Sequence, residues 1–299
     1  MTRILIVRLS ALGDVIHTIP AVVALRDALG GEITWAVERP YAELVEIVTG
    51  VTAVRASIRK WGRSLFSSRN DIRIFVSRIR RSDIAVDFQG LIKSAAVARI
   101  SGAPIRYGFD RAAIREKLAA SFINEHVTVD QSRHVVEWNM QLASAVAKRE
   151  LVMPDVDFSK FASGSGQKKI VVLPGAGKPN KIWPPERWGE VMRKLGIPAI
   201  AVWGPKEREL AERTGLELAP PTNLRELAAY LKDATLVAGG DTGPLHLAAA
   251  LGTRVVGLYG PTNVRRNGPF GQVGRCITGP TMDEISIDSV IDKIKINLV

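Results

Sequence analysis

The sequence predicts an α/β protein built from two doubly wound domains, and three observations support this. Short apolar runs alternate with amphipathic stretches along the chain, as in parallel sheets covered by helices. The alternation stops once, in a polar tract rich in Gly and Ser at residues 155–169, and then restarts. The length of 299 residues suits two domains, each large enough to bury its own core.

In the first half of the chain, apolar runs predict strands at residues 4–9, 33–37, 51–56, 84–87 and 127–129. A tight turn at 10–13 leads into a predicted helix at 14–29. Proline fixes φ and lacks an N–H, so Pro20 is expected to break or restart that helix.

In the second half, strands are predicted at residues 170–173, 199–203, 236–238 and 255–259. Helices are predicted at 185–195, 206–214, 224–231, 244–251 and 286–298. We therefore expect one domain at 1–155, a linker at 156–169 and a second domain at 170–299.

Composition narrows the class of protein. With 46% hydrophobic and 24% charged residues, the chain is globular rather than disordered. The single cysteine, Cys276, rules out an internal disulfide framework and a thiolate cluster for zinc. Four scattered histidines make a metal cage unlikely. The apolar run at residues 4–7 is too short for a signal peptide, and no run reaches the ~18 residues of a membrane span. We expect a cytoplasmic protein.

Positive charge is concentrated in one segment. The net charge is +11, from 41 basic and 30 acidic side chains, and residues 55–81 carry nine basic side chains against one acidic. This segment is either a solvated helix face or a surface that binds a polyanion. Because aromatic residues are sparse there and no nucleic-acid module is present, a membrane surface or phosphorylated lipid is favoured over nucleic acid.

Three segments follow predicted strands, where open parallel sheets bind their ligands. The first, R-L-S-A-L-G-D at 8–14, lacks the G-x-G-x-x-G pattern of dinucleotide-binding turns. It places Asp14 at the start of a helix, where a carboxylate either caps the helix or acts as a general base.

The other two segments suit a diphosphate. L-P-G-A-G-K-P-N-K-I-W-P at 173–184 fails the phosphate-loop spacing, but its small residues and lysines can approach an anion. A-G-G-D-T-G-P-L-H-L at 238–247 predicts a helix start with free N–H groups and the Thr242 hydroxyl. His246 is either a packed helix residue or part of this site. The sequence thus predicts a nucleotide donor in the second domain and an anionic acceptor in the first.

These segments form an ordered series of motifs across nearly the whole chain: V-R-L-S-A-L-G-D-V-I-H-T-I-P (7–20), D-F-Q-G-L-I-K-S-A (87–95), K-I-W-P (181–184), W-G-P-K-E-R-E (203–209), G-D-T-G-P-L-H-L-A-A-A-L (240–251) and L-Y-G-P-T (258–262). The series resembles the heptosyltransferases of glycosyltransferase family 9. The resemblance implies a GT-B fold, two Rossmann-like domains facing a cleft, with a C-terminal helix that can cross back to the first domain. It also implies transfer of heptose from ADP-heptose to the Kdo of Kdo-lipid A, with inversion at the anomeric carbon.

The resemblance also assigns roles residue by residue. Asp14 matches the general base, and Lys181 the lysine that meets the phosphates and sugar of the donor. Glu207 would bind the ribose, with Glu209 a near competitor, and Asp241 the heptose hydroxyls. The remaining donor residues are Gly175, Thr242, Gly243 and His246, of which the role of His246 is open. The residues implied for the acceptor are Arg8, Arg59, Lys60, Arg63, Gln89 and Lys93.

One loop departs from the family pattern. Gly175-Ala176-Gly177 stands where some members have hydroxyl-bearing residues, so phosphate contacts from this loop would be mainly backbone ones.

We expect a metal-independent reaction, because no acidic pair resembles the Mg²⁺ site of a nucleotide-sugar enzyme. We also expect a monomer that binds no nucleic acid and lies at the inner face of the inner membrane. A sibling activity, addition of the second heptose or of another sugar, is the alternative enzyme. A protein that only binds anionic lipid or nucleic acid is a more distant alternative.

Overall fold

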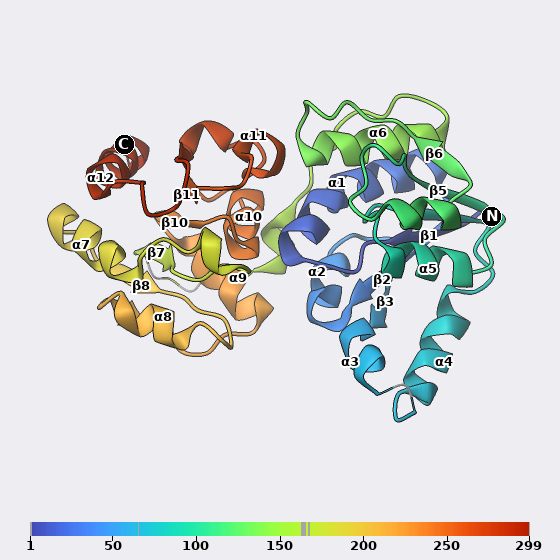
Figure 1. Cartoon of the computed structure of the whole chain (residues 1–299), viewed down its shortest axis with the longest axis horizontal. Coiled ribbons are helices and arrows are strands. Elements are labelled where there is room, and N and C mark those ends of the chain that lie inside the picture. Colours follow the sequence, from blue (N-terminus) through green and yellow to red (C-terminus); the bar gives the residue numbers. More distant parts are fainter. Residues whose placement is uncertain (1, 65, 163–165, 167, 299) are drawn as a thin grey trace. The chain divides into compact units, whose positions relative to one another are not determined.

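The computed structural model describes residues 2–64, 66–162, 166 and 168–298, apart from the side chains of Arg59 and Ser159. The chain divides into two compact units, Met1–Val156 and Asp157–Val299. Each unit is a parallel sheet with helices on both faces (Figure 1). The α/β class predicted from the alternation of strands and helices is therefore confirmed.

In the first unit the described residues form a six-stranded sheet in the order β3-β2-β1-β4-β5-β6, with all neighbours parallel. Its strands are β1 (Arg3–Val7), β2 (Glu32–Glu38), β3 (Val51–Ala56), β4 (Ile84–Asp87), β5 (Ile105–Phe109) and β6 (Glu125–Val127). The central strand β1 is buried from Ile4 to Val7, as expected for an apolar run covered on both faces.

The helices of this unit connect successive strands of the sheet, except for the last, which follows β6. They are α1 (Leu12–Leu29), α2 (Ala42–Val45), α3 (Ile58–Arg63), α4 (Arg69–Ile79), α5 (Ile92–Ile100) and α6 (Val135–Ala147), with short 3₁₀ turns η1 (Arg39–Tyr41) and η2 (Lys117–Phe122). Helices α1 and α6 pack side by side on one face of the sheet (Figure 1).

Helix α1 runs unbroken through Pro20, so the predicted break at this proline is wrong. A proline inside a helix removes a backbone hydrogen bond and normally costs about 3 kcal/mol. The carbonyl that loses its donor is that of Ile16, and Asn139 of α6 contacts the same turn, where its Nδ2 donates to the neighbouring carbonyl of His17 at 2.9 Å. Helix α1 also packs along α6, and this tertiary packing favours the continuous helix.

In the second unit the described residues form a six-stranded parallel sheet in the order β12-β11-β10-β7-β8-β9. Its strands are β7 (Ile170–Leu173), β8 (Ala199–Ala201), β9 (Glu217–Leu218), β10 (Leu236–Gly240), β11 (Val255–Tyr259) and β12 (Ile277–Thr278). Its helices are α7 (Pro185–Leu195), α8 (Arg208–Arg213), α9 (Leu224–Asp233), α10 (Gly243–Ala250), α11 (Val264–Asn267) and α12 (Ile287–Leu298), with η3 (Phe158–Phe161), η4 (Pro179–Lys181) and η5 (Val273–Arg275).

Helix α12 packs its apolar face into the core of its own unit. Val290, Ile291 and Ile294 join the cluster that holds Trp183 and Trp188, and α12 lies against α7 and β11. The apolar face of this helix, at Val290, Ile291 and Ile294, is thus used within the second unit.

The predicted linker at 156–169 extends partly outside the described residues, at 163–165 and 167. In the described part, Phe158, Phe161 and Ala162 are buried within the second unit. The stretch is thus anchored by apolar side chains that its polar composition conceals. Among the described residues, no helix combines the length and apolarity that crossing a bilayer requires.

Candidate active site

Both sheets have the strand order of a doubly wound fold, and each therefore has one topological switch point, where the strand order reverses. The order reverses between β1 and β4 in the first unit and between β7 and β10 in the second. Ligands of such sheets bind outside the carboxyl ends of the strands at this switch point. Asp14 follows β1 and Gln89 follows β4, whereas Lys181 follows β7 and Asp241 follows β10. The predicted residues therefore flank the two switch points.

In the first unit, Asp14 lies in the first turn of α1 and is paired with a buried arginine. Helix α1 begins at Leu12, so Asp14 is not its N-cap, and its Oδ2 instead accepts the backbone N–H of Ala11 at 3.1 Å. Its Oδ1 lies 2.7 Å from Arg8 Nη2. The Asp14 side chain is 47% exposed and that of Arg8 only 8%. The carboxylate is thus bound by buried Arg8 on one side and exposed to solvent on the other.

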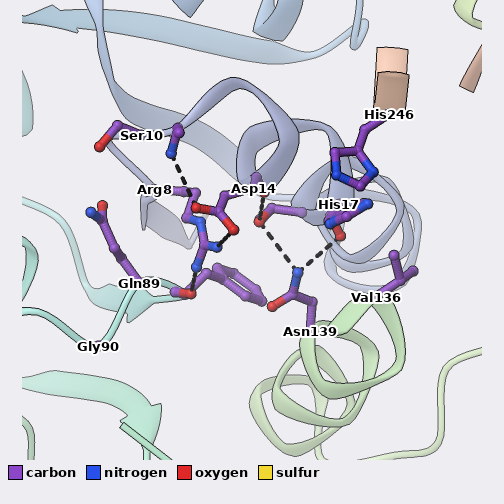
Figure 2. A network of polar contacts seen from close by, with 12 residues as sticks. Arg8, Ser10, Asp14, His17, Gln89, Gly90, Val136, Asn139 and His246 are labelled. Carbon is purple, nitrogen blue, oxygen red and sulfur yellow. Dashed lines mark hydrogen bonds and ion pairs between the residues drawn. The ribbon is translucent and has the colours of Figure 1, made fainter. Parts of the chain in front are cut away.

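The turn between β4 and α5 packs against the turn that carries Asp14. Arg8 Nη1 donates to the carbonyl of Phe88, and the Leu9 N–H donates to Gln89 Oε1 at 2.8 Å. Lys93 Nζ lies 3.4 Å from Ser10 Oγ. Figure 2 shows Arg8 beside Asp14, with Gln89 on the neighbouring turn. Three of the residues implied for the acceptor, Arg8, Gln89 and Lys93, are therefore gathered within reach of Asp14.

In the second unit, Lys181 and His246 converge on Asp241. Lys181 Nζ lies 2.5 Å from Asp241 Oδ2, and His246 Nε2 lies 3.4 Å from Oδ1. Burial raises the pKa of Asp241, but hydrogen bonds from His246 and Lys181 outweigh this effect and bring the pKa below its ordinary value. A carboxylate that is ionised and held on both oxygens can orient a hydroxyl-bearing ligand.

Two glycines let the loops of this site approach each other. A Cβ on Gly240 would come within 2.6 Å of the Lys181 carbonyl oxygen, and a Cβ on Gly239 within 2.8 Å of Leu173 Cβ. After Asp241, the extended Thr242 leads into α10, with Gly243 and Pro244 in its first turn. The Thr242 hydroxyl makes no capping bond, so it and the Gly243 N–H point to an anion site at the helix start.

Glu207 is seated against a glycine of the β7 loop. Its Oε2 accepts the Gly204 N–H at 2.9 Å, and any Cβ on Gly175 would overlap its carboxylate. Gly175 is therefore required for Glu207 to reach this position. Glu209 lies in the first turn of α8 and is exposed, so of the two acids it is Glu207 that borders the β7 loop.

The basic segment forms helices α3 and α4, which pack on β3 through buried apolar side chains. Trp61 and Phe75 meet with ring centroids 5.1 Å apart. Lys60 and Arg63 are exposed, and Lys60 Nζ lies 3.3 Å from Asp71. The side chain of Arg59 lies outside those that the structure describes. Phe66, beyond α3, is 85% exposed, with Arg69 stacked on its ring at 5.8 Å. The segment thus presents charge and one aromatic side chain to solvent.

The remaining chemistry-bearing residues do not form a second centre. Within residues 2–64, 66–162, 166 and 168–298, no three His, Cys, Asp or Glu side chains are grouped as a metal would need. Burial raises the pKa of the Cys276 thiol to about 12, so this cysteine remains protonated.

Two Rossmann-like units, each with charged side chains at its switch point, are the arrangement of a GT-B glycosyltransferase. A family model described as "Glycosyltransferase family 9 (heptosyltransferase)" matches residues 72–290. The chain belongs to this family, and the resemblance noted in its motifs is confirmed.

The similar proteins cover nearly the whole chain. The chain is 30% identical to lipopolysaccharide heptosyltransferase 1 of Salmonella typhimurium, over 98% of this chain and 99% of that protein. It is 34% identical to the protein of the same name from Pseudomonas aeruginosa, over 90% and 82%. The structure of E. coli heptosyltransferase WaaC with ADP superposes with a TM-score of 0.85 at 28% identity, over 99% and 100%.

The sequence did not single out two side chains that organise the site. Asp87 is buried below the Gln89 turn, and Asn139 reaches α1 from a helix over a hundred residues away. Asp87 opens the D-F-Q-G motif and could have been found there as an acid ending an apolar strand. Nothing in the local sequence marks Asn139.

Proposed function

We propose that the protein transfers heptose from ADP-heptose to the Kdo of Kdo-lipid A, the first heptose addition in lipopolysaccharide core biosynthesis. Membership of the heptosyltransferase family supports heptose transfer. Two solved structures of E. coli WaaC are complexes with ADP and with ADP-2-deoxy-2-fluoro heptose, which supports the donor. Relatives named heptosyltransferase 1 match nearly full length, whereas one named heptosyltransferase 3 matches 46% of the chain, which favours the first addition.

The observation that carries the mechanism is the half-exposed Asp14 carboxylate held by buried Arg8 at the first switch point. Asp14 removes the proton of the acceptor hydroxyl as its oxygen bonds to the anomeric carbon. The bond from that carbon to the diphosphate breaks on the opposite face, and its electron pair leaves with ADP. The anomeric configuration is therefore inverted.

The second unit holds the donor and its leaving group. The Lys181 ammonium, the Thr242 hydroxyl and the Gly243 N–H stabilise charge that grows on the diphosphate. Asp241 accepts hydrogen bonds from heptose hydroxyls, and Glu207, beside Gly175, accepts those of the ribose. His246 keeps Asp241 oriented.

The first unit binds the acceptor. Gln89 and Lys93 meet it next to Asp14, and Arg59, Lys60 and Arg63 attract its phosphates and carboxylates. An anionic bilayer favours basic groups by about 1 kcal/mol each. The protein accordingly binds peripherally to the inner face of the inner membrane. It acts from the cytoplasm as a monomer and binds no nucleic acid.

Incubation of the purified protein with ADP-heptose and Kdo-lipid A tests the proposal. ADP release and a lipid product heavier by one heptose are expected, and both should persist in EDTA. An acceptor that already carries a heptose is the matched control and should give no product. Product only with that control would assign the second addition, and dependence on a divalent metal would contradict the metal-free mechanism.

A further inference from the structure

Asp87 is a buried carboxylate that the proposed mechanism does not use. It ends β4 beside Val7 of β1 and is 1% exposed. Its Oδ1 accepts the N–H groups of Gln89 and Gly90 at 2.9 and 3.3 Å, and its Oδ2 accepts the Ser94 hydroxyl at 3.0 Å. This one side chain therefore holds both the turn after β4 and the start of α5.

The turn that Asp87 holds is linked to Asp14 through Arg8. The Phe88 carbonyl, within that turn, accepts Arg8 Nη1, while Nη2 of the same guanidinium pairs with Asp14 at 2.7 Å. The neighbouring Gln89 side chain accepts the Leu9 N–H, which ties the same turn to the end of β1. A displacement of the turn would therefore move Arg8 and the carboxylate that it orients (Figure 2).

The ionised state of the buried Asp87 carboxylate has a physical cost and must be stabilised by its neighbours. Burial raises the pKa of Asp87 to about 6, although hydrogen bonds from Gln89, Ser94 and Gly90 and the charge of Arg8 all favour ionisation. An asparagine oxygen could accept the same N–H groups without burying a charge. The ionised form makes stronger hydrogen bonds and places an anion near the guanidinium of Arg8.

We propose that Asp87 is a positioning residue for heptose transfer, which holds the Phe88–Gly90 turn and Arg8 so that the Asp14 carboxylate faces the acceptor hydroxyl. The proposal rests on the proposed role of Asp14 as the base. It assigns to Asp87 no contact with either substrate.

Protonation of Asp87 should then lower turnover. The charged group that acts on it is Arg8 at the end of β1, with Asp14 of α1 beyond the guanidinium, while Lys93 of α5 lies 3.4 Å from Ser10 in the facing turn. Glu116, which follows β5, accepts the Ile92 N–H at the start of α5. As the pH drops through about 6, Asp87 becomes protonated and no longer attracts the Arg8 guanidinium. We therefore expect kcat to fall over this pH range.

Asp87→Asn tests the proposal, because it keeps the shape of the side chain and removes the charge. We expect kcat at pH 7.5 to fall about tenfold, the KM for ADP-heptose to stay unchanged, and the decline near pH 6 to disappear. Ser94→Ala removes one bond to Asp87 but leaves its charge, so it should lower kcat less and retain the decline.

Asp110→Asn is the matched control. Asp110 follows the neighbouring strand β5 and accepts the N–H groups of Ala112 and Ala113 at 3.0 Å, and its side-chain hydrogen bonds among the described residues stay within its own turn and Thr128. This variant should keep both kcat and the pH profile of the wild type.

Three results would overturn the inference: an unchanged kcat in Asp87→Asn, a persistent decline near pH 6, or an equal loss in Asp110→Asn. If Asp87→Asn fails to fold, an unchanged kcat in Ser94→Ala would overturn it as well. Failure of the proposed function would be recognised separately, by a wild type without transfer or by an Asp14→Asn variant that retains full turnover.

Discussion

At the scale of single residues, the proposed function depends on a few side chains placed at strand ends. Asp14 is the clearest, because its carboxylate is anchored on one side by Arg8 and by the Ala11 N–H and is open on the other. Asp14→Asn retains an oxygen for the Ala11 N–H, so the fold and the affinity for ADP should be preserved. We expect kcat to fall at least ~100-fold, since a positioned base contributes that much or more.

Steady-state kinetics, calorimetry with ADP and thermal melting together check this expectation. Turnover within a few-fold of the wild type would leave Asp14 with only a structural role in the first turn of α1. A parallel loss of melting temperature and activity would also count against the catalytic role.

Lys181 provides a second prediction at this scale. Its ammonium lies beside Asp241 at the switch point of the second unit. A hydrogen bond to a charged group contributes about 1.5–3 kcal/mol, so Lys181→Ala should weaken ADP binding roughly 10- to 100-fold. Lys178, an exposed lysine of the same loop, and Arg63 of α3 are the controls. Calorimetry should show near-wild-type affinity for both, and equal losses in all three variants would mean that the donor is assigned to the wrong residues.

At the scale of elements, helix α1 depends on α6. Asn139 Nδ2 donates to the His17 carbonyl, one turn before Pro20, and lies 3.3 Å from the Thr18 hydroxyl. Asn139→Leu should reduce the free energy of unfolding by about 1–3 kcal/mol, because it removes a buried hydrogen bond between α6 and α1. Pro20→Ala restores the N–H that donates to the Ile16 carbonyl, so α1 should depend less on α6 and that penalty should be smaller. Chemical denaturation of the two single variants and the double variant measures the coupling, and strictly additive effects would contradict this explanation of the unbroken helix.

The α3–α4 region supports a prediction about the acceptor. Replacing Arg59, Lys60 and Arg63 with Gln should raise the KM for Kdo-lipid A and leave that for ADP-heptose nearly unchanged. Higher salt should have the same effect, because surface attraction is screened over about 8 Å at physiological ionic strength. A control variant with the same loss of charge replaces Arg193, Lys194 and Lys295 of the second unit. Sedimentation with anionic vesicles should fall only in the first variant, and unchanged KM and sedimentation would favour a solvated surface.

At the scale of the whole molecule, stability responds to the burial of Asp87. Its pKa is raised from 3.8 to about 6, so the folded state holds the proton more tightly than the unfolded state does. The free energy of unfolding contributed by this group therefore falls as the pH rises from about 4 to 6 and is constant above that. The decrease is on the order of 3 kcal/mol.

Other carboxylates change the free energy of unfolding with pH in the opposite direction. Hydrogen bonds from Arg3 lower the pKa of Asp83, and hydrogen bonds from His246 and Lys181 lower the pKa of Asp241. The difference between wild type and Asp87→Asn isolates the effect of Asp87. Denaturant unfolding at several pH values should show the free energy of unfolding of the wild type falling relative to that of Asp87→Asn as the pH rises from 4 to 6. A difference that is independent of pH would contradict the raised pKa.

Much of this molecule was accessible from the sequence. The alternation of apolar runs located β3, β4, β7 and β11, and the family motifs located the residues at both switch points. This succeeded because buried parallel strands need continuous apolar runs, and a site for a diphosphate needs small residues and donors at helix starts. Strands β5, β9 and β12 were not identified, and β6 lies two residues before its predicted position. These strands are short or contain polar residues, so their pairing comes from the neighbouring strand.

What the sequence by itself determined is the fold class, the family and the chemistry of the site residues, since these depend on local patterns of residue type. Only the tertiary structure decided how those residues are supported. It showed that Arg8 pairs with Asp14, that Asp87 holds the turn beside them and that α12 packs within its own unit. It also showed that Asn139 meets the turn before Pro20, a contact between residues 122 positions apart. Such contacts are set by the packing of elements distant in sequence, and no local pattern contains that information.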